Sequence, residues 1–116
     1  MKTDQLSGLR DALRVFAKER EWDQFHSPKN LAIALSVEAA ELLEHFQWRT
    51  GNEEVLDLAT REKVAEEMAD VLLHLIRLAD KLDVDLLGAA DQKMKTNTRK
   101  YPVEKSRGNS KKYTEL

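Results

Sequence analysis

Hydrophobic residues recur every three or four positions along most of this chain, and this spacing limits its fold more than any other feature. Such spacing places them together on one face of an α-helix. Four segments show it, at about residues 4–20, 28–49, 61–82 and 85–97. No segment shows the period-two alternation of a β-strand, and only four glycines and two prolines interrupt the 116 residues. The sequence therefore predicts an all-α fold, an antiparallel bundle of about four helices.

Polar residues indicate where these helices begin and end. Ser27 followed by Pro28 is typical of a helix start, because the hydroxyl caps the first turn and proline needs no N–H there. Thr60 is the expected cap of the third helix, and Gly51 suits the end of the second. From residue 102 the chain is polar and basic and lacks periodicity. We therefore expect one helical domain at 1–101 and an extended or mobile tail at 102–116.

The third predicted helix carries hydrophobic residues on more than one side. Val64, Met68 and Val71 belong to its main face, whereas Leu73 and Ile76 point elsewhere. A helix that is apolar on several sides is covered on several sides. Because so short a chain buries only a modest core, we expect part of this cover from a second copy, in a dimer or in a tetramer built from dimers.

Composition narrows the classes of function. The net charge of −2 provides no general attraction to nucleic acid polymers or anionic membranes. The absence of cysteine excludes disulfides and thiolate chemistry and fits a reducing compartment. The first residues are too polar for a signal peptide, and the most apolar stretch, "VLLHLIRLA", is too short to span a bilayer. We expect a soluble, cytoplasmic protein.

Two pairs of acidic residues flank the hydrophobic faces of the second and third helices. At 100° per residue, Glu38 and Glu41 fall on one flank of the second helix, and Glu67 and Asp70 on one flank of the third. A single pair of this kind is usually a solvated surface charge. Two pairs on successive antiparallel helices converge, and four crowded carboxylates require a counter-charge.

A hard divalent cation would supply this charge. Carboxylate oxygens favour Mg²⁺ or Mn²⁺ over zinc, which prefers histidine or cysteine. A di-iron centre would need Glu-x-x-His pairs, and no glutamate stands three positions before His26, His45 or His74. Because Mg²⁺ sites of this kind borrow part of their coordination from substrate phosphates, the pattern favours phosphate chemistry.

The motif Glu38-x-x-Glu41 followed by Glu67-x-x-Asp70 resembles the ExxE…ExxD signature of the MazG-like all-α nucleoside triphosphate pyrophosphohydrolases. The segments "EWDQFHSPKNLAIALSVEAAELLEHFQW", "KMKTNTRKYP" and "KKYTEL" are similar to the dCTP pyrophosphatase branch. The resemblance implies Mg²⁺-dependent hydrolysis of a nucleoside triphosphate, such as dCTP or a modified dCTP, to the monophosphate and pyrophosphate. It also implies an all-α oligomer, commonly a tetramer, that controls or cleans a nucleotide pool.

The resemblance assigns roles to particular residues. It places the metal and the catalysis on Glu38, Glu41, Glu67 and Asp70, and the base against Trp22 and Trp48, with the segment from Trp22 to His26 touching the nucleotide. The further candidates for contact with sugar or phosphate, on the residues alone, are His74, Lys93, Asn97, Arg99 and Tyr101.

Several alternatives stay open at this point. The branch tends to have tyrosine at the position of His74 and histidine at that of Leu13, which leaves the base preference open. A sibling enzyme acting on dUTP or on several triphosphates is one alternative, and a helical interaction module without activity is another. The number of metal ions and the identity of the general base are also open.

Overall fold

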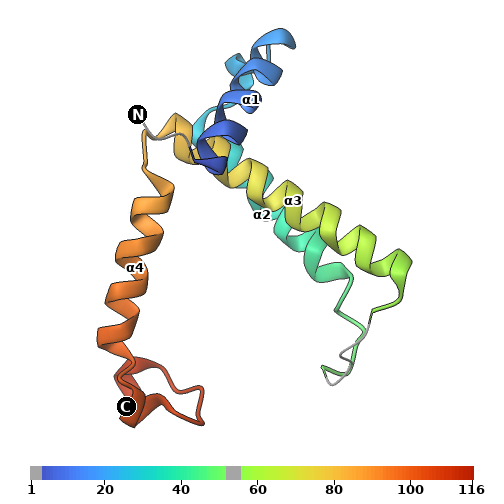
Figure 1. The fold of residues 1–116 in the computed structure, drawn as a ribbon. Helices are drawn as coiled ribbons and strands as arrows, with labels where there is room; N and C mark the ends of the chain where they lie inside the picture. The colour runs from blue at the N-terminus through green and yellow to red at the C-terminus, as the bar shows by residue number, and fades with distance from the viewer. Residues whose placement is uncertain (1–3, 52–55) are drawn as a thin grey trace. The chain divides into compact units, whose positions relative to one another are not determined.

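The computed structural model describes residues 4–51 and 56–116, and all regular structure in these two ranges is helical (Figure 1). The prediction of an all-α fold is therefore confirmed for this part of the chain, with five α-helices instead of about four. The elements are α1 (Gln5–Glu19), the 3₁₀ helix η1 (Asp23–Phe25), α2 (Pro28–Glu44), α3 (Leu58–Lys81), α4 (Leu86–Lys100), α5 (Val103–Ser106) and the 3₁₀ helix η2 (Tyr113–Glu115). No helix among the described residues is long and apolar enough to cross a membrane.

Side-chain caps fix where the long helices begin. The Ser27 hydroxyl accepts the N–H of Asn30 at 3.1 Å, and Pro28 opens α2 as predicted. The prediction for α3 was wrong by one turn, because Asp57 is the cap and accepts the N–H of Thr60 at 3.1 Å. A carboxylate is a strong acceptor at the positive end of the helix dipole, so α3 begins before Thr60.

The end of α2 also differs from the sequence prediction. The helix stops at Glu44, about five residues early, because its last bonds tighten to the i→i−3 pattern. The N–H of His45 donates to the carbonyl of Leu42 at 3.3 Å, and that of Phe46 to Leu43 at 2.9 Å. Trp48 consequently lies in a turn beyond α2, although the sequence predicted it inside the second helix.

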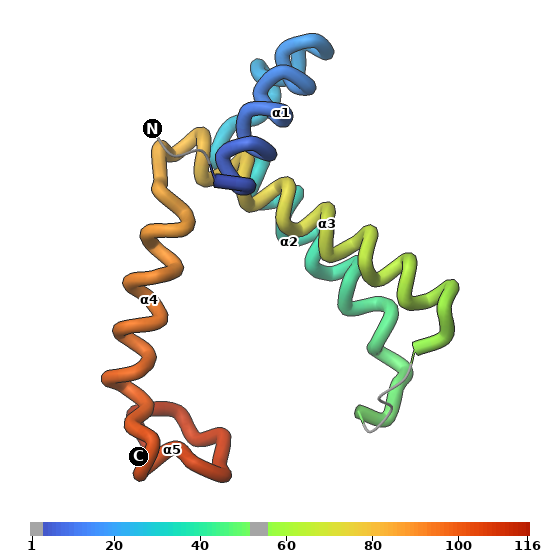
Figure 2. Tube along the Cα trace, in the orientation of Figure 1, coloured from blue at the N-terminus to red at the C-terminus, as the bar shows by residue number. Residues whose placement is uncertain are grey.

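The contacts of the chain group it into two units, residues 1–84 and 85–116. In the first unit α2 and α3 run antiparallel and pack along their length, and α1 packs on α3 (Figures 1 and 2). The buried apolar residues of this unit come from all three helices and are Ala17, Leu31, Val64, Ile76 and Ala79.

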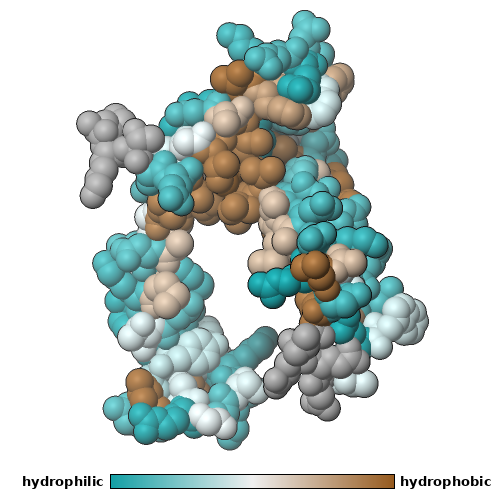
Figure 3. All heavy atoms as spheres, turned by 45° about the vertical axis from the view of Figure 1, so that its right-hand side comes forward, coloured by the Kyte–Doolittle hydropathy of each residue, from teal (hydrophilic) through white to brown (hydrophobic). Residues whose placement is uncertain are grey.

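Many hydrophobic side chains stay at the surface of the chain (Figure 3). On α3, Met68 is 57% exposed, although it was predicted on the main hydrophobic face, and Leu72 is 39% exposed. Exposed apolar area of this kind is typical of protein–protein contact surfaces. The predicted homo-oligomer remains a prediction.

The second unit contains α4, α5 and η2. The ring of Tyr113 packs edge-to-face on Tyr101 with centroids 6.2 Å apart, and the Lys100 ammonium lies 4.5 Å from the centre of the Tyr113 ring. These contacts order two short helical turns, so the expectation of an extended tail was wrong for 103–106 and 113–115. The division into a domain at 1–101 and a tail at 102–116 stays a prediction.

An ion pair between α1 and α3 gives the first unit a testable acid sensitivity. Arg14 Nε donates to Asp80 Oδ2 at 2.8 Å, and the Arg14 guanidinium lowers the pKa of Asp80 below its ordinary value of 3.8. A lowered pKa means that the stabilisation is present above pH 3.8 and is lost as the pH falls through the lower, folded-state value. We expect Asp80→Asn to cost about 1–3 kcal/mol of unfolding free energy at pH 7, and this deficit to shrink below pH 3.8.

Urea unfolding of Asp80→Asn between pH 7 and pH 2, at one protein concentration, measures the effect. Asp11→Asn is the matched control, because the exposed Asp11 carboxylate is also 3.6 Å from Arg14. Its cost should stay within about 0.5 kcal/mol at every pH. A deficit for Asp80→Asn that does not change with pH would contradict the assignment.

Candidate active site and metal centre

Helices α2 and α3 bring three carboxylates to one point. One oxygen each from Glu38, Glu67 and Asp70 lies within 4.8 Å of the other two. Glu38 comes from α2, and Glu67 and Asp70 stand one turn apart on α3. All three residues are half-buried. The two acid motifs of the sequence thus meet between the antiparallel helices.

Two oxygens of this cluster lack a hydrogen-bond partner. Oε2 of Glu38 and Oε2 of Glu67 are buried, and no hydrogen bond reaches either one from the described residues. A buried acceptor without a partner is costly, and a buried charge more so. The cluster therefore has the electrostatics of a site for a cation.

The pKa values of the two glutamates agree with this description. Burial raises the pKa of Glu38 above its ordinary value of 4.5, and the nearby carboxylates of Glu41 and Asp70 raise it further. Burial also raises the pKa of Glu67, and Glu41, Glu38 and Asp70 add to the effect. Glu41 is thus close to both glutamates, although it is not part of the compact group of three.

The donor set fits a hard divalent cation. Every group in the cluster offers carboxylate oxygen, which suits Mg²⁺ or Mn²⁺ better than a metal that prefers nitrogen or sulfur. The chain has no cysteine. His74, one turn after Asp70 on α3, is not part of this group of ligand atoms, and its Nδ1 is 2.8 Å from the backbone oxygen of Asp70.

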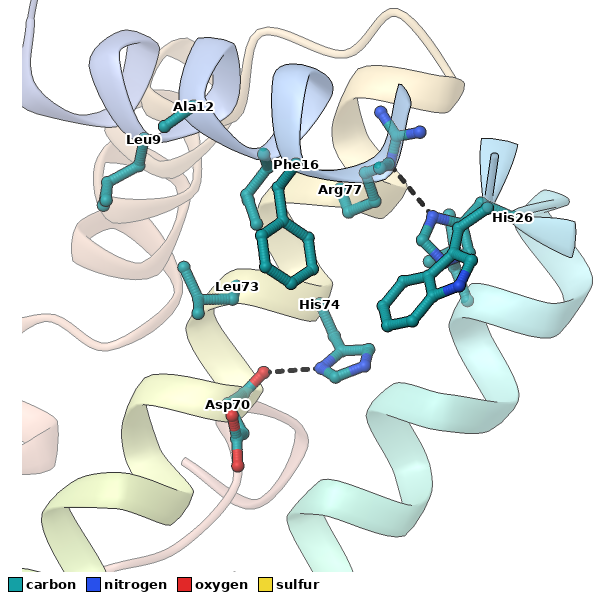
Figure 4. A pocket seen from close by; sticks show the side chains of 12 residues that line it. Leu9, Ala12, Phe16, His26, Asp70, Leu73, His74 and Arg77 are labelled. Carbon is teal, nitrogen blue, oxygen red and sulfur yellow. Dashed lines mark hydrogen bonds between the residues drawn. The ribbon is translucent and has the colours of Figure 1, made fainter. Parts of the chain in front are cut away.

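A cavity of about 430 Å³ adjoins the cluster, and Asp70 belongs to both (Figure 4). Most of its lining residues are apolar, and five of the twelve come from α1. The polar side chains on its wall are His26, Asp70, His74 and Arg77. Figure 4 shows the rings of Phe16, His26 and His74 around one space. An apolar cavity with a few polar groups is typical of a small-molecule site.

The turn after α1 places Trp22 on the wall of this cavity. Glu21 adopts a positive φ of 54°, and the N–H of Trp22 donates back to the carbonyl of Ala17 at 2.9 Å. This left-handed turn ends α1 and folds the indole onto the helix. The Trp22 ring meets Phe16 at 5.6 Å and His26 at 6.2 Å between centroids, both edge-on, and is 44% exposed.

The structure adds Arg77, which the sequence analysis missed. Arg77 is 6% exposed and lines the cavity from α3. Its Nε donates to Nδ1 of His26 at 3.2 Å (Figure 4), and its Nη2 pairs with Asp23. The sequence signal was available, because an arginine inside the stretch "LIRLA" is a charge on a hydrophobic face and needs partners.

The remaining predicted substrate contacts are one residue of the first unit and four residues of the second. Trp48 is 89% exposed in the turn after α2. Four residues belong to the second unit, on α4 or at its C-terminal cap: Lys93, Asn97, Arg99 and Tyr101. Within that unit the N–H of Tyr101 donates to the carbonyl of Asn97 at 2.9 Å. Their contact with substrate stays a prediction.

Comparison with known proteins gives consistent matches. The sequence profile of the MazG-like family matches residues 33–116. The chain is 44% identical to dCTP pyrophosphatase 1 of Mus musculus and 46% identical to that of Homo sapiens, in both cases over 96% of this chain and 67% of the relative. A crystal structure of a pyrophosphatase from Archaeoglobus fulgidus superposes with a TM-score of 0.74 at 39% identity, over 88% of this chain and 96% of that one.

Proposed function

Because the chain belongs to the MazG-like family and is a dCTP pyrophosphatase-like nucleoside triphosphate pyrophosphohydrolase, we propose that its substrate is dCTP or a modified dCTP. The products are the nucleoside monophosphate and pyrophosphate. The observation that carries this proposal is the cluster of Glu38, Glu67 and Asp70, with two unpartnered buried oxygens, beside a cavity of about 430 Å³. The cavity is in the size range of small-molecule sites.

The four acids are the proposed metal ligands and catalytic residues: Glu38, Glu41, Glu67 and Asp70. Mg²⁺, or Mn²⁺ in its place, would supply positive charge for the phosphates and a bound water of lowered pKa. Because Asp70 belongs both to the cluster and to the cavity, a base inside the cavity directs the phosphates of the same nucleotide toward the acids. Positioning and charge neutralisation account for most of the acceleration in reactions of this kind.

The cavity residues are the proposed contacts of base and sugar. Trp22 offers an aromatic face for stacking, His26 a ring nitrogen for the base, and His74 a ring beside Asp70 for the sugar. Trp48 is a second proposed contact of the base, and the proposed contacts of the phosphates are Lys93, Asn97, Arg99 and Tyr101. A homo-oligomer and a cytoplasmic location complete the proposal, and the exposed apolar side chains of α3 support the oligomer.

A second candidate function follows from two residues of the cavity. Leu13 and His74 both line it, at positions where the dCTP pyrophosphatase branch tends to have histidine and tyrosine. Both changes alter the groups that meet base or sugar. An enzyme of the same superfamily that prefers dUTP, or accepts several triphosphates, is therefore the alternative.

A panel of deoxynucleoside triphosphates, assayed for pyrophosphate release with Mg²⁺ or with EDTA, tests the proposal. We expect the highest kcat/KM for dCTP, dCMP and pyrophosphate in equal amounts, and loss of activity in EDTA that Mg²⁺ restores. A preference for dUTP would show that the proposed substrate is wrong and that the proposed hydrolysis to monophosphate and pyrophosphate is right. No pyrophosphate from any member of the panel would overturn the proposed function.

A further inference from the structure

Arg77 carries a buried positive charge at the wall of the cavity, and its guanidinium contacts three side chains. Its Nη2 pairs with Asp23, its Nε donates to His26, and its Nη1 lies 3.6 Å from Oδ2 of Asp80. Its side chain is 7% exposed. Burying a guanidinium is favourable only when its donors are used, so these contacts fix the position of the group.

The bond from Arg77 determines which nitrogen of His26 carries the proton. Arginine has only donors, so Nδ1 of His26 must be the acceptor in the 3.2 Å contact. In a neutral imidazole the proton is then on Nε2. No acceptor for Nε2 occurs among the residues that the structure describes, and His26 lines the cavity. His26 thus presents a free N–H donor at the cavity wall.

The charges around His26 favour its neutral form. Burial lowers the pKa of His26 below 6.5, the cations Arg77 and Lys81 lower it further, and His74 acts in the same direction. Only Asp23 acts the other way, and its charge is already paired with Arg77 and with Lys81 at 2.5 Å.

The same guanidinium holds both ends of the turn that carries the aromatic wall. Asp23 is the first residue of η1, and His26 directly follows it. Trp22 stands immediately before the turn, and its ring meets that of His26. The planar fork of arginine reaches both partners at once, which the single ammonium of lysine does not.

We propose that Arg77 is a positioning and specificity residue, which holds η1 on α3 and fixes His26 as an Nε2–H donor for a hydrogen-bond acceptor on the nucleobase. The inference rests on the proposed function, because the nucleotide is the ligand that meets this donor. Carbonyl oxygens and unprotonated ring nitrogens are the acceptors on base edges.

The first test needs no variant. Nitrogen-15 NMR of the histidine rings in the wild-type protein, without metal and nucleotide, identifies the tautomer of each ring. We expect the signal of His26 to show a protonated Nε2 and an unprotonated Nδ1 at pH 7. A proton on Nδ1, or a doubly protonated ring at that pH, would overturn the proposal.

The second test compares Arg77→Met with Arg14→Met. Methionine keeps much of the stem volume and removes every donor, whereas Arg14 pairs with Asp80 and does not contact His26. We expect Arg77→Met to raise KM for dCTP about tenfold with kcat within about twofold, and to raise the pKa of His26 in the NMR titration. Arg14→Met should leave KM within about twofold of the wild type. Arg77→Lys keeps the positive charge and should still show the raised KM, because lysine lacks the planar fork.

Two further measurements keep this test decisive. Should Arg77→Met fail to fold, Asp23→Asn loosens the same turn from its other end and should raise KM several-fold. A normal KM for a folded Arg77→Met or Asp23→Asn overturns the proposal.

Mg²⁺-dependent thermal stabilisation should persist in both variants, because neither residue belongs to the acid cluster. If the wild type hydrolyses no nucleotide, the proposed function fails, and the NMR result still decides whether Arg77 fixes His26.

Discussion

Replacing Glu38 by glutamine is expected to lower kcat for dCTP hydrolysis about a thousandfold and to raise the melting temperature of the metal-free protein. The amide keeps the shape of the side chain and removes the charge that a cation would bind, and such electrostatic contributions are the largest in phosphoryl transfer. The melting temperature is expected to rise because Glu38 has a buried, unpartnered oxygen beside other carboxylates, and glutamine removes its negative charge from this cluster. Steady-state kinetics and thermal melts, each in EDTA and in Mg²⁺, measure both effects.

Glu44→Gln is the matched control for this experiment. Glu44 is the last residue of α2, is exposed, and lies outside the carboxylate cluster, so the same charge is removed from the same helix. We expect its activity to stay within about twofold of the wild type and its melting temperature to stay Mg²⁺-dependent. A fully active Glu38→Gln, or an equal loss in Glu44→Gln, would contradict the assignment of the ligands.

Replacing Trp22 by alanine is expected to raise KM for dCTP by about tenfold to hundredfold, with a smaller change in kcat. Stacking of a base on an aromatic ring contributes about 1–3 kcal/mol, which corresponds to this range. Trp22 lines the cavity and packs on Phe16 and His26, so its ring is held in place before a nucleotide arrives. Initial-rate kinetics over a range of dCTP concentrations separate KM from kcat.

Two controls accompany Trp22→Ala. Trp22→Phe keeps an aromatic face and should recover most of the affinity. Phe46→Ala removes an exposed ring from the turn after α2, 40% exposed and outside the cavity lining, and should leave KM within about twofold. An unchanged KM for Trp22→Ala would show that the base binds elsewhere.

The presence of the long helices and the start of α2 at Pro28 could be predicted from the sequence, whereas the start of α3 and the end of α2 could not. The spacing of hydrophobic residues reports the face that a helix buries, and Val64 on α3 is buried as predicted. On the same helix Met68 is 57% exposed and Ile76 is buried, so the rest of the face differs from the prediction. The residue at which a helix begins or ends depends on which nearby oxygen accepts the backbone N–H groups of its terminal turn. Asp57 displaced Thr60 as the cap of α3, and i→i−3 bonds at His45 and Phe46 ended α2 early.

The same distinction applies to the site. The meeting of Glu38 with Glu67 and Asp70 follows from side-chain directions on two antiparallel helices, which sequence spacing already contains. The cavity does not follow from spacing, because α1, the turn after it and α3 all contribute to its wall. Arg77 appeared in the sequence only as a charge on a hydrophobic face, and its partner His26 is 51 positions away in the chain.

Anomalous diffraction from a crystal soaked in Mn²⁺ tests the central claim most directly, because manganese gives a signal that light atoms do not. We expect an anomalous peak bounded by the carboxylates of Glu38, Glu67 and Asp70, and the loss of that peak in crystals of Glu38→Gln. A peak at another place in a protein that retains Mn²⁺-dependent activity, with none between α2 and α3, would contradict it.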